Sequence, residues 1–216
     1  MIYLEPYHKT SISQKNNTDY TKASMAHAVY QTKAYILQTI TRKEANEILV
    51  CFSERFGLIY VSSQSTRKQS SKMRMHIHNN SLVMIDVVQG RGMWRLTGIH
   101  PLVSSFFYVE SGWYPLMVRY GETMMRLLAG EESHAEVWDD VEQLFTAIQE
   151  DKKVKAAPVY EIIMMARLLY HLGYWNDNYM FIKDSLTFDD TYIAEVRKNK
   201  TKIIKHINHG LSISQL

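Results

Sequence analysis

Residues 47–74, EILVCFSERFGLIYVSSQSTRKQSSKMR, contain two apolar runs joined by a short turn and followed by a basic loop. Glu47–Ser53 and Leu58–Ser63 carry β-branched and aromatic residues at roughly alternate positions, which predicts two strands. Glu54–Gly57 between them has the length and the glycine of a hairpin connection. The loop after this hairpin contains four basic residues, Arg67, Lys68, Lys72 and Arg74.

This basic loop is free of acid, because no carboxylate lies between Glu54 and Asp86. Mobile Arg and Lys side chains beside a rigid sheet are suited to meet the phosphates of a nucleic acid. The alternative is a solvated surface loop with a chance run of charges. The loop therefore predicts nucleic-acid binding, with the solvated loop kept open as the second interpretation.

Composition is that of a folded protein, with 216 residues, 46% hydrophobic and 22% charged. No apolar run approaches the ~20 residues that span a bilayer, and the N-terminus lacks the apolar stretch of a secretory signal. The single cysteine, Cys51, lies in a predicted strand, so no disulfide or CxxC zinc pair is expected. We expect a cytoplasmic protein with no membrane contact.

Charge and pattern divide the chain in three. Residues 1–24 are polar and without periodicity, and we expect a disordered leader or a cloning remnant that is dispensable for folding. Residues 25–103 hold ten Lys/Arg and four Asp/Glu and follow a strand pattern. Residues 104–216 follow a helical period, and the segment from Phe106 onwards holds twelve Lys/Arg and sixteen Asp/Glu. Polyanion binding is therefore expected in the first half.

The expected elements follow from this division. Three further strands, Val29–Ile40, Ser81–Gln89 and Met93–His100, complete a small five-stranded β-barrel, with Gly90-Arg91-Gly92 as a hairpin turn. Five helices are expected after Pro101. The first two are a short one at Ser104–Glu110 and a longer one at Leu116–Ala129, and a capping box at Ser133–Glu136 begins the third. The last two run from Pro158 to Gly173 and from about Asp190 to Gly210. The fold class is α+β.

The order of these parts resembles the bacterial recombination mediator RecO family. The similar features are Thr32-Lys33-Ala34 in the first strand, the turn Glu54–Gly57, the loop Thr66-Arg67-Lys68, His171-Leu172-Gly173-Tyr174 at the end of a central helix, and the C-terminus Ile204–Leu216. The resemblance covers residues 25–216 and lies in order and spacing. It implies an N-terminal OB-type barrel at 25–103 that binds nucleic acid and an α-helical domain at 104–216.

The resemblance also implies a function without a catalytic step. RecO-like proteins bind single-stranded DNA, with double-stranded DNA as a second ligand, promote strand annealing and assist RecA loading together with RecR and single-strand-binding protein. Many members carry a four-cysteine zinc module after the central helix, but Trp175–Met180 contains no thiol, so no zinc is expected. Two alternatives stay open: a protein-interaction adaptor with little DNA affinity, and an RNA-binding barrel protein.

The candidate site consists of basic residues on the barrel and one aromatic. The nucleic-acid-binding residues predicted are Lys33, Arg42, Lys43, Arg67, Lys68, Lys72, Arg74, Arg91, Arg95 and Trp94. Trp94 would stack on a base, although a core aromatic is its main alternative, and for Tyr60 the core is favoured more strongly. No nucleotide-binding loop, HExxH or GxSxG motif suggests an enzyme, and no cofactor is expected. His76 and His78 could share one strand face, but a third metal ligand is missing.

Overall fold

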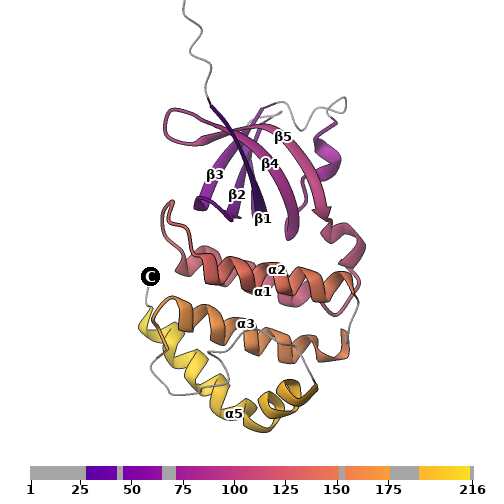
Figure 1. Cartoon of the computed structure of the whole chain (residues 1–216), viewed down its shortest axis with the longest axis vertical. Coiled ribbons are helices and arrows are strands. Elements are labelled where there is room, and N and C mark those ends of the chain that lie inside the picture. The colour runs from indigo at the N-terminus through magenta and orange to yellow at the C-terminus, as the bar shows by residue number, and fades with distance from the viewer. Residues whose placement is uncertain (1–27, 43–45, 65–71, 151–153, 176–189, 215–216) are drawn as a thin grey trace, which may run out of the picture.

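The computed structural model describes residues 28–42, 46–64, 72–150, 154–175 and 190–214 (Figure 1). The predicted leader at 1–24 lies outside these ranges, as do Lys43, Arg67 and Lys68 of the predicted site. So does most of Trp175–Met180, the segment compared with the zinc module.

Five strands form a sheet that closes in a ring in the order β1-β2-β3-β5-β4. The bounds are Val29–Arg42 for β1, Asn46–Ser53 for β2, Gly57–Ser63 for β3, Ser81–Gln89 for β4 and Trp94–Val103 for β5. All neighbouring strands are antiparallel except β3 and β5, which pair in parallel at Val61–Trp94 and Ser62–Arg95. The five predicted strands and the α+β class are confirmed.

Side-chain alternation explains how the ring is filled. Leu49 and Cys51 of β2 and Ile59 and Val61 of β3 lie at every second position and point into the ring, because successive side chains of a strand face opposite sides. They pack with inward-facing residues of the other strands, among them Ala34, Ile36, Val83, Ile85, Val87 and Leu96. The two apolar runs quoted from the sequence thus supply a large part of the ring interior.

Helices follow the sheet, with bounds Tyr114–Leu127 for α1, Ala135–Gln149 for α2, Ala157–His171 for α3 and Asp190–Ile213 for α5. Short 3₁₀ turns lie at Arg74–His76 (η1), Ser105–Tyr108 (η2) and Val154–Ala156 (η3). Pro158 stands in the first turn of α3, as predicted, and Gly173 follows the helix with a φ of 78°. Among the described residues, no helix is long and apolar enough to cross a membrane.

The predicted capping box at Ser133–Glu136 is wrong. The N-cap of α2 is His134, and no side chain caps its amides. The Ser133 hydroxyl donates instead to the carbonyl oxygen of Glu54, at 3.2 Å, in the turn between β2 and β3. The Ser133 hydroxyl, which the local pattern assigned to helix capping, therefore forms a hydrogen bond with a segment distant in sequence.

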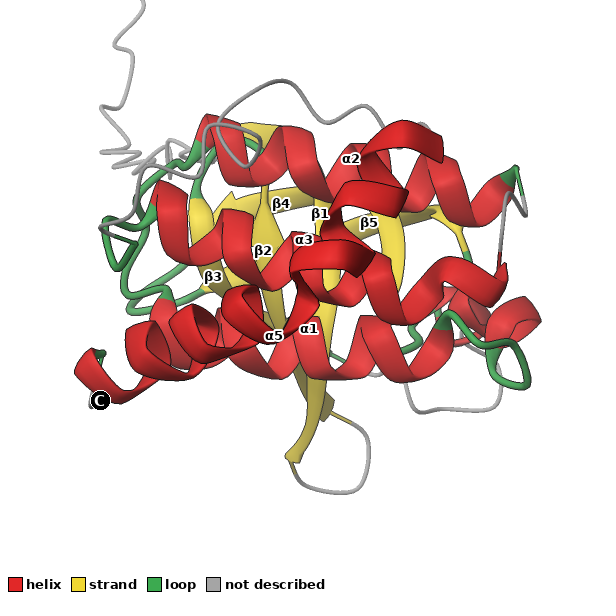
Figure 2. Cartoon of the chain, turned by 90° about the horizontal axis from the view of Figure 1, so that it is seen from below, coloured by secondary structure: helices red, strands yellow, loops and turns green. Residues whose placement is uncertain are grey.

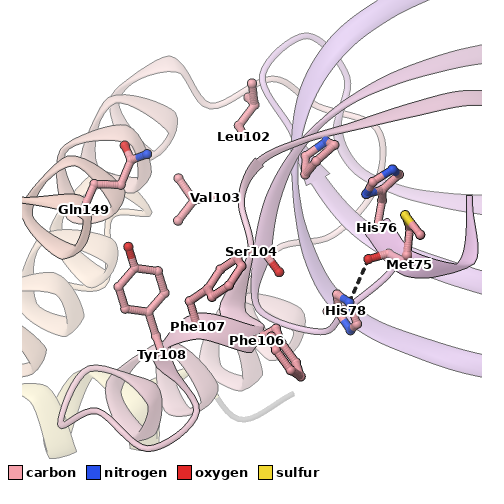
Figure 3. A pocket seen from close by; sticks show the side chains of 11 residues that line it. Met75, His76, His78, Leu102, Val103, Ser104, Phe106, Phe107, Tyr108 and Gln149 are labelled. Atoms are coloured by element: carbon pink, nitrogen blue, oxygen red, sulfur yellow. Dashed lines mark hydrogen bonds between the residues drawn. The ribbon is translucent and has the colours of Figure 1, made fainter.

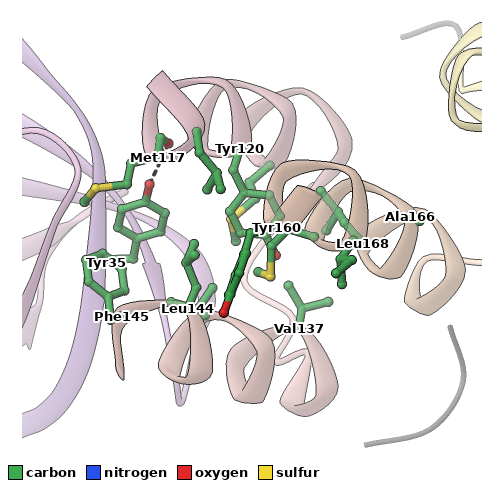
Figure 4. Close-up of a cluster of buried hydrophobic side chains, with 14 of the residues drawn as sticks. Tyr35, Met117, Tyr120, Val137, Leu144, Phe145, Tyr160, Ala166 and Leu168 are labelled. Atoms are coloured by element: carbon green, nitrogen blue, oxygen red, sulfur yellow. Dashed lines mark hydrogen bonds between the residues drawn. The ribbon is translucent and has the colours of Figure 1, made fainter. Parts of the chain in front are cut away.

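The helices cover one side of the ring (Figure 2), and the two parts share one core. Tyr35, Phe52 and Leu58 project from the outside of the sheet into a cluster with Trp138 and Met117 of the helices. The Tyr35 hydroxyl donates to the Met117 carbonyl oxygen at 2.8 Å (Figure 4). The sheet is thereby fixed to α1 and α2, and its surface away from the helices is left to solvent.

Candidate nucleic-acid interface

An exposed aromatic residue lies on the outer surface of β3. Tyr60 and Ser62 alternate with Ile59 and Val61, whose side chains fill the ring, so both point outward. The Tyr60 side chain is 49% exposed. The Ser62 hydroxyl donates to the Trp94 carbonyl oxygen at 3.0 Å and thereby ties β3 to β5. The outer surface of β3 therefore presents a phenol ring on a fixed strand.

Strand register places basic and apolar residues on the same outer surface as Tyr60. Arg95 lies opposite Ser62 across the parallel β3–β5 pairing, and Ile48 lies opposite Ser62 on the other side. Ile40 lies opposite Ile48, and Arg42 follows two positions later on the same face of β1. We call this surface the Tyr60 face and define it by Ile40, Arg42, Tyr60, Ser62 and Arg95. Arg42 and Arg95 are exposed and form no ion pair within the described ranges.

Arg91 lies in the turn between β4 and β5, close in sequence to Arg95. The Gly90 amide donates to the Met93 carbonyl oxygen at 3.1 Å, which closes the predicted hairpin. Gly92 has a φ of 88°, a conformation that favours glycine. The turn holds Arg91 exposed, four residues before Arg95 in the sequence.

Lys33 is directed elsewhere. It lies on the outside of β1 and forms an ion pair with Glu142 of α2. The hydrogen bond to the Glu142 carboxylate raises the pKa of Lys33, against the opposing effect of burial. Because its charge is already paired at the contact between sheet and helices, Lys33 is a poor phosphate ligand in this conformation.

Trp94 is inside the ring, with only 5% of its surface exposed. Its ring lies 4.6 Å from that of Phe56 and 5.7 Å from that of Tyr30, measured between centroids. Its indole N–H donates to a carboxylate oxygen of Glu131 at 3.1 Å. Protein side chains occupy the positions that a stacked base would need. Trp94 is therefore a core residue in this structure.

The described end of the basic loop leads to a different region. Lys72 and Arg74 are exposed and directly precede Met75 and His76, which line a cavity of about 500 Å³ (Figure 3). The other lining residues are His78, Pro101, Leu102, Val103, Ser104, Phe106, Phe107, Tyr108 and Gln149. Phe106 is 67% exposed and Phe107 79% exposed, so the cavity opens beside a patch of uncovered aromatic surface.

Metal-binding geometry is not found near the two histidines. Nε2 of His78 is hydrogen-bonded to the Met75 carbonyl oxygen, at 2.9 Å (Figure 3). Nowhere among the described residues are three His, Cys, Asp or Glu side chains grouped as a metal site requires. Cys51 is buried in the ring, and burial raises the pKa of its thiol to about 12, which keeps it protonated.

Two residues of this side of the sheet were not included in the prediction from sequence. For Tyr60 the sequence favours a core position over base stacking, but its alternation with the inward Ile59 and Val61 makes its side chain point outward. Arg55 lies in the β2–β3 turn, where it donates to the Gln31 carbonyl oxygen at 3.3 Å and lies 5.4 Å from the Phe56 ring centroid. No local pattern distinguishes Arg55 from an ordinary turn residue.

Neither the protein-family models nor the curated proteins contain a match to this chain.

Proposed function

We propose that this chain is a non-catalytic DNA-binding protein of recombination and repair, similar to the RecO family, and that the Tyr60 face binds single-stranded DNA. The observation that carries the proposal is the half-exposed Tyr60 on a closed sheet, with Arg42 and Arg95 on the same outer surface and in no ion pair among the described residues. Bases stack on exposed aromatic rings while Arg side chains follow the phosphates, which is how sheets of this kind hold single strands.

The topology supports an OB-type assignment. The strand order β1-β2-β3-β5-β4, with only β3 and β5 parallel, is the order in which an OB-type barrel closes. Such barrels bind oligonucleotides over strands 2 and 3 and the loops β1–β2 and β4–β5. In this chain Tyr60 lies on β3, Arg42 at the end of β1 and Arg91 in the β4–β5 turn.

The proposed activity is strand annealing and assistance to RecA loading with RecR and single-strand-binding protein, as the family resemblance implies. Annealing needs only that cationic side chains reduce the repulsion between two phosphate backbones while the bases stay free to pair. No bond is made or broken by the protein, so no residue is assigned a catalytic role.

The test separates stacking from charge. Replacing Tyr60 with Ala should weaken binding of a single-stranded oligonucleotide by about 1–3 kcal/mol at unchanged salt dependence, whereas Tyr60→Phe keeps the ring and most of the affinity. Replacing Arg42, Arg91 and Arg95 with Ala should flatten the plot of log affinity against log salt by about 0.7 for each lost contact. Lys155→Ala, an exposed charge on η3, is the control and should leave both quantities unchanged.

Results of the same titration can reject the proposal. If the Tyr60 and arginine variants bind as the parent does, the DNA surface is not the Tyr60 face. If the parent prefers an RNA oligonucleotide of the same sequence, recognition of the 2′-hydroxyl favours the RNA-binding alternative.

One observation favours a second candidate, the protein-interaction adaptor. Phe106 and Phe107 are largely exposed beside the cavity of about 500 Å³, and uncovered aromatic surface of this kind marks protein contacts. The adaptor would bind single-strand-binding protein or RecR here and would show negligible salt-dependent oligonucleotide binding. Phe107→Ala should then reduce partner capture and leave the Tyr60 face unaffected.

A further inference from the structure

The last helix carries a cationic surface that the net charge of the helical half conceals. From Val196 to Ser214 the sequence contains no Asp or Glu, and it contains five basic residues, Arg197, Lys198, Lys200, Lys202 and Lys205. All five side chains are exposed on α5. This stretch therefore differs in charge from the rest of residues 106–216, where acids outnumber Lys and Arg.

Helical spacing collects part of this charge in one line. Ile193, Val196, Ile203 and Ile207 are buried and fix the side of α5 that packs on the other helices. Lys198, Lys202, Lys205 and His209 follow one another at intervals of four, three and four residues, so they lie along the opposite, solvent side. At about 1.5 Å of rise per residue, this α5 stripe is about 16 Å long.

Nothing in the described part of the protein accounts for the stripe. None of its lysines forms an ion pair there, although i,i+3 and i,i+4 spacing sets like charges beside each other, which is unfavourable in an isolated helix. The helix dipole favours cations only in the last turn, and the last turn of α5 contains no Lys or Arg. A ligand outside the chain would offset this repulsion.

We propose that the α5 stripe binds the phosphate backbone of a nucleic acid, as a second site apart from the Tyr60 face. The lysines of the stripe, Lys198, Lys202 and Lys205, span about 10 Å at about 1.5 Å of rise per residue, so they can contact neighbouring phosphates of one nucleic-acid backbone. A lipid surface fits less well, because membrane helices insert an apolar side and the apolar side of α5 is already buried in the core.

The position of the stripe gives it a function. α5 lies at the end of the molecule opposite the strands, with α1, α2 and α3 between them (Figure 1). One strand on the Tyr60 face and another on the α5 stripe would thus be held by the same chain. The protein then bridges two nucleic-acid strands as a monomer, a consequence that rests on the proposed function of the Tyr60 face.

The experiment measures bridging and binding separately. An oligonucleotide fixed to beads is incubated with the full chain and with a second, labelled, non-complementary oligonucleotide, and the captured label is counted. The stripe variant Lys198→Ala/Lys202→Ala should lower capture at least about tenfold while the fixed oligonucleotide still binds protein through the Tyr60 face. Arg197→Ala/Lys200→Ala removes two charges from the same helix off the stripe and should retain capture.

The outcomes distinguish this inference from the proposed function. If the stripe and off-stripe variants capture equally, the stripe is not a nucleic-acid site, and the proposed function is untouched. If the Arg42, Arg91 and Arg95 variant keeps full binding and only the stripe variant loses it, the stripe stands and the Tyr60 face is rejected. A dimer that forms without DNA and disappears in the stripe variant, seen by sedimentation, would assign the stripe to a second copy and overturn the inference.

Discussion

Cys51 and Tyr35 place two ionisable groups where water does not reach. The Cys51 thiol lies in the interior of the ring and the Tyr35 phenol lies between the sheet and the helices. Burial raises the pKa of Cys51 from 9.0 to about 12 and moves the pKa of Tyr35 well above 10.0. Each group therefore stays protonated in the folded protein at a pH where the unfolded chain loses the proton.

This difference predicts alkaline destabilisation. When the pKa of an acid is higher in the folded than in the unfolded state, the free energy of unfolding does not change with pH below the unfolded-state pKa. It falls as pH rises from the unfolded-state pKa toward the folded-state pKa. Between about pH 8 and about pH 10.5, Cys51 alone should cost about 2 kcal/mol, and Tyr35 adds to this loss. Urea unfolding at the two pH values measures it. Cys51→Ala should show a smaller loss than the parent, and equal losses would mean that the thiol is not responsible.

Tyr60 and Trp94 show what alternation can predict about single residues. Consecutive positions of a strand face opposite sides, so the inward Val61 makes Tyr60 outward, and this could be derived from the sequence once β3 was placed. The side of Trp94 is harder to predict, because it depends on the pairing of β5 with β3, where Trp94 lies opposite Val61, 33 positions earlier in the sequence. Pairing at such distance has no local signature, so the aromatic chosen for stacking was the one in the core.

The β2–β3 turn depends on glycine for two separate reasons. Gly57 has a φ of 66°, and a Cβ at this position would lie 1.9 Å from the Glu132 carbonyl oxygen. Gly92 in the β4–β5 turn has a φ of 88°, and a Cβ at this position would have no other atom within 4 Å. The two positions share the backbone conformation but only Gly57 is in contact with the segment before α2.

Alanine substitutions at the two glycines should therefore differ. Gly92→Ala carries only the left-handed strain, about 1–2 kcal/mol. Gly57→Ala adds the forced separation of the turn from Glu132, a further cost of about 1–3 kcal/mol. Chemical denaturation of both variants gives the comparison. Equal losses would show that the segment before α2 does not press on the turn.

A buried ion pair joins the helices. Asp140 of α2 accepts two hydrogen bonds from Nε of Arg167 on α3, each 2.9 Å, and lies 3.2 Å from Nε2 of His171. Asp140→Ala should lower the free energy of unfolding by about 3–5 kcal/mol, because it leaves a buried guanidinium without its carboxylate. Arg119→Ala breaks the exposed pair with Glu161 between α1 and α3 and should cost no more than about 1 kcal/mol. Thermal melts that rank the two variants the other way would contradict this assignment.

Helix positions were predictable where the signal is local. Pro158 and Gly173 bound α3 because a missing N–H and a left-handed backbone are properties of single residues. The described part of α5 starts at Asp190, and the residues before it lie outside the described ranges, so the predicted N-cap stays a prediction. The start of α2 was misassigned, since the Ser133 hydroxyl has a partner in the β2–β3 turn that no local pattern contains.

Over the whole molecule, the net charge of each half conceals how the charges are distributed among the helices. The helical half has a surplus of acids, from which the sequence predicts that polyanion binding is concentrated in the first half. The structure separates the two signs by element: Glu136 and Asp139 are exposed on α2, whereas the exposed charges of the second half of α5 are all basic. Net charge over a domain therefore does not show which helix carries which sign.

The division into residues 25–103 and 104–216 describes the chain order, but one core spans the boundary. Tyr35, Phe52 and Leu58 of the sheet pack in the same cluster as Trp138 and Met117 of the helices. The Lys33–Glu142 pair and the Ser133–Glu54 hydrogen bond add polar links across the same contact. Losing either part would expose the large apolar side chains of the other.

We therefore expect sheet and helices to unfold together. Because the shared cluster stabilises both parts, far-ultraviolet circular dichroism, which follows the helices, and tryptophan fluorescence should give one transition with the same midpoint. A fragment of residues 25–103 should lack a cooperative transition, since Tyr35, Phe52 and Leu58 would face water in it. Two separate transitions in the full chain, or a fragment that melts cooperatively, would instead show that each half folds on its own and that the shared cluster is only a contact between domains.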